Sequence, residues 1–240
     1  MCFFLWKYRT CSCIIDIEKR QQTNDGRRHD KRMAGTKQWR AADGRLQPGF
    51  QTAGFTLKQV GKLQALGAQT LYFEHEKSGA SLFYIRNKDT NRGFSISYRT
   101  PHLDETDTNH VFEHSVLASS DKYPSKDIFF DLCSKTYHTF VNAFTYIPFT
   151  AYPVCSQSEE QLLKMADVYL SCMKAPGIRR ERRFFDREAV RYELRDRESP
   201  ITLAGTVYSE DFGMLNDTDN EALRNVLRAL YPGETAANAN

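Results

Sequence analysis

Long apolar runs are missing from this 240-residue sequence, and none approaches the length of about 20 residues that a membrane-spanning helix needs. A large excess of one sign of charge is also missing, because 33 Lys and Arg are nearly balanced by 30 Asp and Glu, which gives a formal net charge of +3. The composition therefore predicts no membrane partner and no nucleic-acid partner. Hydrophobic residues make up 40% of the sequence, which is enough for one good core or two small ones.

Cysteine is sparse as well, with six residues whose positions match neither a disulfide framework nor a paired metal knuckle. Cys133, Cys155 and Cys172 lie in apolar stretches, which is typical of buried thiols in a reducing compartment. The sequence therefore favours the cytoplasm, with the mitochondrial matrix or another organelle as the alternative in a eukaryote.

The first 45 residues differ from the rest in charge, with 11 Lys and Arg against 5 Asp and Glu. The opening Met-Cys-Phe-Phe-Leu-Trp is too short for the apolar core of a signal peptide. A mitochondrial transit peptide would be basic and poor in acids. Four acids interrupt that pattern, at Asp16, Glu18, Asp25 and Asp30. We expect residues 1–45 to be a disordered extension, or non-native sequence upstream of a start at Met33.

Alternating apolar residues predict an antiparallel sheet from residue 68 onward. Residues 68–87 predict two strands around a turn at Lys77-Ser78-Gly79. Residues 93–100 predict a third strand, ended by Pro101, and we expect these three strands to form a meander. The aromatic-rich segment that follows predicts two more strands, at about 138–146 and 149–155.

Capping residues and helical periodicity predict the helices. Acids and threonines at 104–108 favour a helix that begins there and runs to about Ala118. Ser158 and Gln161 form a capping box that opens another helix, which ends before Pro176. Further helices are expected at 125–135, 181–196, 205–215 and 221–230. Strands in one block and helices in another predict an α+β fold, an antiparallel-rich sheet covered by helices on one face.

Two histidines and a glutamate lie close together in the first predicted helix, as His110-Val111-Phe112-Glu113-His114. Residues four apart lie one turn apart on the same face, so His110 and His114 can share one zinc ion. Glu113 lies at the edge of that face, where a carboxylate can take a proton from water without being a ligand. Hydrolytic zinc sites commonly add a third protein ligand, often Glu. The alternative is an ordinary helix with two solvated or buried histidines.

His-x-x-Glu-His is the inverted zinc signature, and the chain resembles the inverzincin metallopeptidases of the insulinase/pitrilysin superfamily, most of all their presequence protease branch. The resemblance covers about residues 68–233 and is carried by "NHVFEHSVLASSDKYPSKDIFFDL", "TFVNAFTY" and "AYPVCSQ". It implies a zinc-dependent endopeptidase, with one Zn²⁺ per domain, that hydrolyses short unstructured peptides through a zinc-activated water.

The resemblance also implies a role for each residue of the site. His110 and His114 would be zinc ligands, Glu113 the general base, and Glu210 the third ligand, 100 positions after His110. Around Glu210, the glycines and the Val-aromatic pair match the family, whereas Ser209, Asp211 and Phe212 depart from it. Another departure is Asp107, where the family usually has glycine, and we expect a local loop change there rather than loss of zinc.

Substrate would be held by the strand that contains Asn142, Ala143 and Phe144, by resemblance to the family. An extended peptide can add to an exposed sheet edge through backbone hydrogen bonds. The small Ala143 would let the peptide approach closely, and Phe144 could line a side-chain pocket. The alternative is an interior strand with Phe140 and Phe144 in the core.

The resemblance implies a longer enzyme, a clamshell whose second half supplies an arginine and a tyrosine to the site. Nothing in this sequence matches those residues. We therefore expect residues 46–233 to be the first, zinc-binding domain and residues 234–240 a truncated tail. The partners would be a peptide substrate and the missing C-terminal half, and the fragment would bind zinc with little or no peptidase activity alone.

Three other functions are open to these residues. A non-catalytic scaffold of the same fold would need none of the histidines or Glu113 of the signature. A cysteine hydrolase could use Cys133 and His138, but five residues across a helix end give them no reason to meet. A nucleic-acid module could use the arginines of "IRRERRFFDR", which are interleaved with acids and so favour a solvated helix face.

Overall fold

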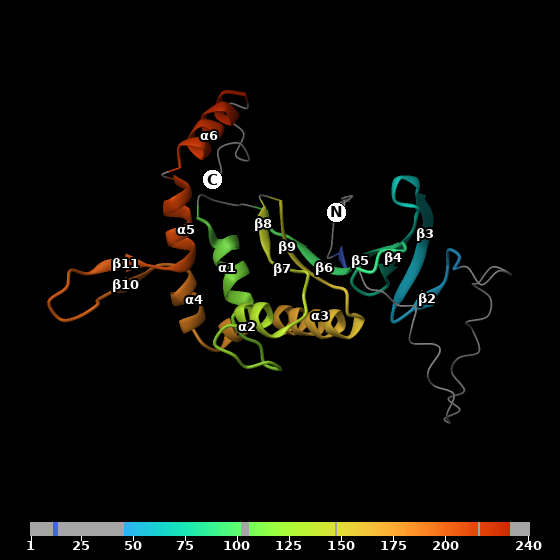
Figure 1. Cartoon of the computed structure of the whole chain (residues 1–240), viewed down its shortest axis with the longest axis horizontal. Coiled ribbons are helices and arrows are strands. Elements are labelled where there is room, and N and C mark those ends of the chain that lie inside the picture. The colour runs from blue at the N-terminus through green and yellow to red at the C-terminus, as the bar shows by residue number, and fades with distance from the viewer. Residues whose placement is uncertain (1–11, 14–45, 102–105, 147, 216, 231–240) are drawn as a thin grey trace.

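The computed structural model describes residues 12–13, 46–101, 106–146, 148–215 and 217–230, and Figure 1 shows their arrangement. The helices are α1 (Thr108–Val116), α2 (Ile128–Lys135), α3 (Glu159–Lys174), α4 (Arg183–Glu188), α5 (Thr206–Leu215), α6 (Thr218–Leu230) and the 3₁₀ turns η3 (Gln64–Leu66) and η4 (Gly177–Arg179). The strands are β1 (Ser12–Cys13), β2 (Gln51–Thr52), β3 (Phe55–Leu63), β4 (Ala68–His75), β5 (Ser81–Arg86), β6 (Arg92–Arg99), β7 (Phe140–Val141), β8 (Phe144–Tyr146), β9 (Phe149–Ser156), β10 (Arg191–Glu193) and β11 (Thr202–Ala204).

Strands β1 to β9 form one sheet, in the order β2-β3-β4-β5-β1-β6-β9-β7, with β8 also paired to β9. All of these pairs are antiparallel except β1 with β5. The predicted α+β fold with an antiparallel-rich sheet is confirmed. The expected three-stranded meander is wrong in one respect: β6 pairs with β1 and not with β5, so a two-residue strand lies between them.

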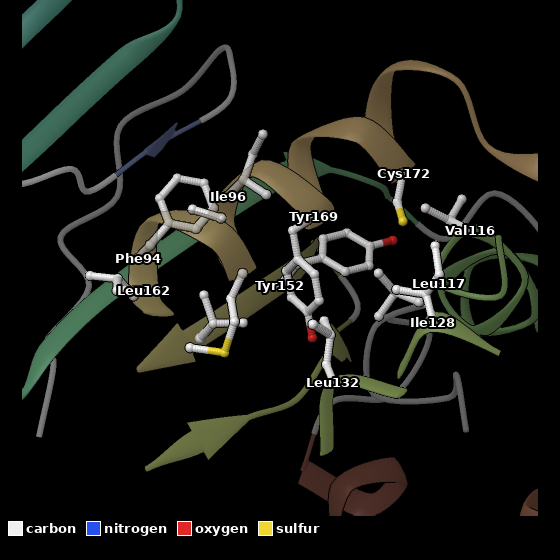
Figure 2. Packing of buried hydrophobic residues seen from close by; sticks show 13 residues of the cluster. Phe94, Ile96, Val116, Leu117, Ile128, Leu132, Tyr152, Leu162, Tyr169 and Cys172 are labelled. Carbon is white, nitrogen blue, oxygen red and sulfur yellow. The ribbon is translucent and has the colours of Figure 1, made fainter. Parts of the chain in front are cut away.

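The main core lies where α1, α2 and α3 pack on β6 and β9, and Figure 2 shows its side chains. Tyr169 and Met165 of α3 are fully buried and lie among Val154 of β9 and Val116 of α1. Alternate residues of β6 and β9 face this layer, which is the period of 2 that a half-covered sheet requires. A smaller cluster of β3, β4 and β5 residues holds the far end of the sheet, around Leu57.

Helix α3 begins as its capping residues predicted. Ser158 accepts a hydrogen bond from Gln161 N at 3.4 Å, and the acids at Glu159 and Glu160 lie in the first turn. Helix α2 begins in the same way, because Asp127 accepts from Phe130 N at 3.1 Å. Both helices are therefore fixed at their starts by local contacts and on one face by the core.

The helix expected at 181–196 is wrong beyond Glu188. Helix α4 ends there, and the chain continues as the hairpin β10–β11, which projects from the body in Figure 1. Gly205 shows why: a Cβ at this position would lie 1.7 Å from Ala189 O, so the two ends of the hairpin touch backbone to backbone. Asp196 turns the chain between the strands, accepting from Ser199 N at 2.8 Å.

Two expected segments lie mostly or wholly outside the described residues. Only Ser12–Cys13 of the extension at 1–45 is described, as strand β1, and none of the tail at 234–240. Among the described residues, no helix has both the length and the apolar character needed to cross a bilayer.

Candidate metal centre

Helix α1 presents both histidines of the signature to the same side. The rings of His110 and His114 lie 4.8 Å apart between centroids and meet edge to face, at 81°. Both side chains are about four-fifths covered, with 19% and 23% exposed. This is the result expected for positions i and i+4 of a helix.

Helix α5 brings Glu210 to the two rings. Glu210 Oε2 lies 3.4 Å from His110 Nε2 and 3.6 Å from His114 Nε2. The ligand atoms of these three residues all lie within 4.8 Å of one another. The Glu210 side chain is 48% exposed, so the carboxylate reaches the rings from the solvent side.

These distances suit a zinc ion. A tetrahedral ion with ligands at about 2.0–2.2 Å places its ligand atoms roughly 3.3–3.6 Å apart. Two imidazole nitrogens and one carboxylate also form a known ligand set for hydrolytic zinc sites. The two distances from Glu210 therefore fit a zinc site, and the three residues fit zinc in their chemistry.

A carboxylate holds the outer nitrogen of each ring. Asp107 Oδ2 lies 2.8 Å from His110 Nδ1, and Glu188 Oε2 lies 3.3 Å from His114 Nδ1. An ionised carboxylate only accepts hydrogen bonds, so each ring donates from Nδ1 and turns Nε2 towards Glu210. Both rings are thereby oriented for a ligand on the Nε2 side.

The same contacts govern protonation of the rings. The hydrogen bond to Asp107 raises the pKa of His110 and outweighs partial burial. Burial lowers the pKa of His114, but the hydrogen bond with Glu188 and nearby carboxylates outweigh it, so this pKa is also raised. Burial acts to raise the pKa of Glu188 itself, yet its hydrogen bonds, among them those with His114 and Arg187, hold the pKa at about 2.

Glu113 lies beside the two histidines and is 6% exposed. Burial raises the pKa of its carboxyl group, although a hydrogen bond from Thr145 works in the opposite direction. That bond joins Thr145 Oγ1 to Glu113 Oε2 at 2.6 Å. Glu113 is thus a buried carboxyl group with increased proton affinity, held at the edge of the cluster by strand β8.

The predicted substrate residues lie at the edge of the sheet next to helix α1. Strands β7 and β8 both pair with β9, and the order of strands in the described sheet ends with them. Asn142 and Ala143 connect the two strands, and Asn142 Oδ1 accepts a hydrogen bond from Ala143 N at 2.9 Å. Phe144 is half-buried and stacks with Phe140 at 6.2 Å between centroids, so it belongs to an aromatic surface rather than to the core.

Sequence reasoning missed Glu188 and Thr145. Glu188 is 4% exposed, and a buried acid in a segment of alternating charges is not distinguishable by sequence from its solvated neighbours. Thr145 carried a weak signal, because in a strand it alternates with Phe144 and Tyr146 and so faces the opposite side. Cys133 and His138, the residues considered for a cysteine hydrolase, are not part of this cluster.

Comparison with known proteins finds relatives along most of the chain. HypA of Clostridium perfringens is 36% identical over 180 residues, which are 75% of this chain and 18% of that protein. Presequence protease 1, chloroplastic/mitochondrial, of Arabidopsis thaliana is 37% identical over 168 residues, 70% of this chain and 16% of its own length. The mitochondrial presequence protease of Xenopus laevis is 32% identical over 194 residues, 80% of this chain and 19% of its own length.

This chain therefore spans less than a fifth of the length of these curated relatives. No family model matches the sequence. Among solved structures, pitrilysin aligns with 53% of this chain and 14% of its own, at 17% identity and a TM-score of 0.46.

Proposed function

The chain belongs to the insulinase/pitrilysin superfamily of peptidases, on the presequence protease branch, and on this basis we propose that it carries the metal centre of a zinc-dependent endopeptidase. The observation that carries the proposal is the distance of Glu210 Oε2 from the two ring nitrogens, 3.4 and 3.6 Å. His110, His114 and Glu210 would hold the ion. A bound zinc ion would acidify water and polarise a peptide carbonyl.

Glu113 would move the proton. Its carboxyl group lies on the same helix as both histidines, and burial raises its pKa towards neutrality. A base with this property can take a proton from the attacking water and pass it to the leaving amine. The hydroxyl of Thr145 fixes one oxygen of Glu113 at 2.6 Å, which keeps the carboxylate in a constant position during both transfers.

Strands β7 and β8 would receive the peptide. In the described sheet they pair on one side only, with β9, so an extended peptide can add on the other side. Phe140, Phe144 and Tyr146 pack against one another along β7 and β8 with centroids about 6 Å apart, and would contact apolar side chains of that peptide. Backbone pairing explains how such a site accepts peptides of different sequence, provided that they are unstructured.

The relatives extend the proposal to the whole protein. Because this segment spans less than a fifth of their length, we propose that peptide hydrolysis requires further polypeptide and that the segment alone binds zinc with little or no turnover.

The presequence proteases are described as mitochondrial or chloroplastic, which supports the organellar alternative over the cytoplasm. A scaffold role is disfavoured, because a scaffold needs neither Glu113 nor its hydrogen bond to Thr145.

Elemental analysis and kinetics of matched variants test this function. The 240-residue chain, loaded with zinc and dialysed, should retain close to one zinc per chain, and His110→Ala should retain almost none. In the full-length protein, Glu113→Gln should retain zinc and lose hydrolysis of an unstructured peptide by a factor of about 10² or more. Full turnover by Glu113→Gln would remove Glu113 as the base, and the absence of zinc from the wild type would remove the metal centre.

A further inference from the structure

Asp107 occupies the N-cap position of helix α1, but its side chain does not cap the helix. The N-cap residues of α2 and α3, Asp127 and Ser158, both accept a backbone N–H of the first turn. Short polar side chains at this position usually do the same. The carboxylate of Asp107 is instead directed at the ring of His110, with Oδ2 2.8 Å from Nδ1.

This contact resembles the one made on the second histidine. Glu188 holds Nδ1 of His114 from helix α4, and Asp107 holds Nδ1 of His110 from the start of α1. These two carboxylates contact the Nδ1 atoms, and Glu210 lies on the opposite side of the rings, next to the Nε2 atoms. Each ring is therefore held between a carboxylate on Nδ1 and the proposed ligand position on Nε2.

We propose that Asp107 is a positioning residue of the metal centre, which accepts the Nδ1 hydrogen of His110 and so presents the Nε2 lone pair of that ring to the ion. This inference rests on the proposed zinc function and deepens it. An acceptor on Nδ1 fixes the tautomer and orientation of a ligating histidine and makes Nε2 a stronger donor to the metal. Asp107 would do this without touching metal, water or peptide.

A second acid allows the hydrogen bond to be separated from simple charge. Asp211, on helix α5, lies with Oδ1 3.9 Å from the same Nδ1 of His110, which is too long for a hydrogen bond. Asp211 also shares a side-chain hydrogen bond with Asp107. Asp211→Asn removes this second acid, and because an asparagine amide can still donate to the Asp107 carboxylate, the 2.8 Å contact between Asp107 and His110 should be kept. Asp107→Asn removes the same charge together with the ionised acceptor, and asparagine is as good an N-cap residue as aspartate.

The experiment compares the wild-type chain, Asp107→Asn and Asp211→Asn. Zinc dissociation constants are measured by competition with a chromophoric chelator, and the tautomer of His110 by ¹⁵N NMR of histidine-labelled, metal-free protein at alkaline pH. Asp107→Asn should weaken zinc binding by about 10- to 100-fold, and Asp211→Asn by no more than about fivefold. The wild type should show the Nδ1–H tautomer at His110, and Asp107→Asn should show a mixture or the Nε2–H tautomer.

The two readouts separate failure of this inference from failure of the zinc proposal. Equal zinc affinity in the wild type and Asp107→Asn, or equal losses in both variants, would overturn the positioning role while the metal centre stands. A wild-type chain that binds no zinc would overturn the metal centre. In that case the role of Asp107 as the acceptor for His110 is still decided by NMR, where an Nε2–H tautomer in the wild type would refute it. Far-UV circular dichroism and melting of the metal-free proteins provide the control for folding.

Discussion

The hydroxyl of Thr145 donates a 2.6 Å hydrogen bond to Glu113 Oε2, and this bond joins strand β8 to helix α1. Thr145 lies between Phe144 and Tyr146, whose rings contact each other on the other side of the strand. Thr145 thus connects strand β8, which is proposed to bind the peptide, with Glu113, which is proposed to move the proton. In the proposed site, the distance between a bound peptide and Glu113 would therefore be set by the fold.

Replacing Thr145 by valine should leave the Glu113 carboxyl group without this donor. A buried polar group that loses its partner costs about 1–3 kcal/mol, so Thr145→Val should lower the free energy of unfolding by that amount. Thr145→Ser keeps the hydroxyl group and should stay close to the wild type. Urea denaturation at neutral pH measures both, and equal stability of the two variants would show that the bond contributes nothing.

Glu113→Gln should stabilise the metal-free chain at neutral pH. Burial raises the pKa of Glu113 above that of the unfolded chain, so the native state binds this proton more tightly. Stability therefore falls as pH rises through the unfolded pKa and up to the folded pKa, and it stays lower above that range. Glutamine has no charge to bury, and each kcal/mol gained raises the Tm by about 2–4 °C for a chain of this size.

Calorimetry of the metal-free proteins at two pH values checks that prediction. The advantage of Glu113→Gln should be present at neutral pH and disappear at acid pH, below the unfolded pKa, where both side chains are uncharged. A variant that is less stable than the wild type at neutral pH would contradict the assignment of Glu113 as a carboxylate held at a cost to the fold.

Arg187 connects Glu188 to the loop before helix α2. Its guanidinium donates to Lys126 O at 2.7 Å, pairs with Asp127 at 3.2 Å and contacts Glu188. Arg187→Gln should cost about 1–3 kcal/mol, because Glu188 is buried and loses a charged partner.

The pH dependence identifies the cause of that loss. Glu188 has a folded pKa of about 2, below the ordinary value, so its stabilising contribution is present above the unfolded pKa and is lost as pH falls towards 2. Urea unfolding should therefore show a large difference between wild type and Arg187→Gln at neutral pH and a smaller one near pH 2. A difference that does not change with pH would mean that Arg187 acts through packing alone.

Two glycines of one segment should respond in opposite ways to alanine. A Cβ at Gly205 would lie 1.7 Å from Ala189 O, a clash between backbones that cannot relax without moving α4 or α5. Gly205→Ala should cost about 3 kcal/mol or more and should also weaken zinc binding, because α5 carries Glu210. A Cβ at Gly213 would meet nothing within 4 Å beyond its chain neighbours and the backbone of its own helix, so Gly213→Ala should stabilise helix α5 by about 0.5–1 kcal/mol. Similar effects at both positions would contradict the close approach at Gly205.

The parts of the fold that local chemistry determines could be predicted. Helix α3 was expected from the capping box at Ser158, and α1 from the acids and threonines at 104–108; both form, although α1 begins only at Thr108. Strands β4 and β5 follow the alternation around Gly79, which has a positive φ of 68°. In each case the signal lies within a few residues of the element.

The parts that depend on distant contacts could not be predicted. Strand β1 inserts between β5 and β6 from far along the chain, and no local pattern specifies such a partner. The charged segment after Glu188 has the composition of a helix, yet it forms β10, because Gly205 and β11 hold it in place. The spacing between His110 and Glu210 came from the family resemblance alone. The contact of Glu188 with His114 spans 74 positions and had no signal in the sequence.

The most direct test of the metal centre is zinc-edge anomalous diffraction from crystals of the chain grown with Zn²⁺. We predict one strong peak, about 2.0–2.2 Å from His110 Nε2, His114 Nε2 and a Glu210 carboxylate oxygen. A map with no peak between these three side chains, or with its principal peak elsewhere on the protein, would contradict it.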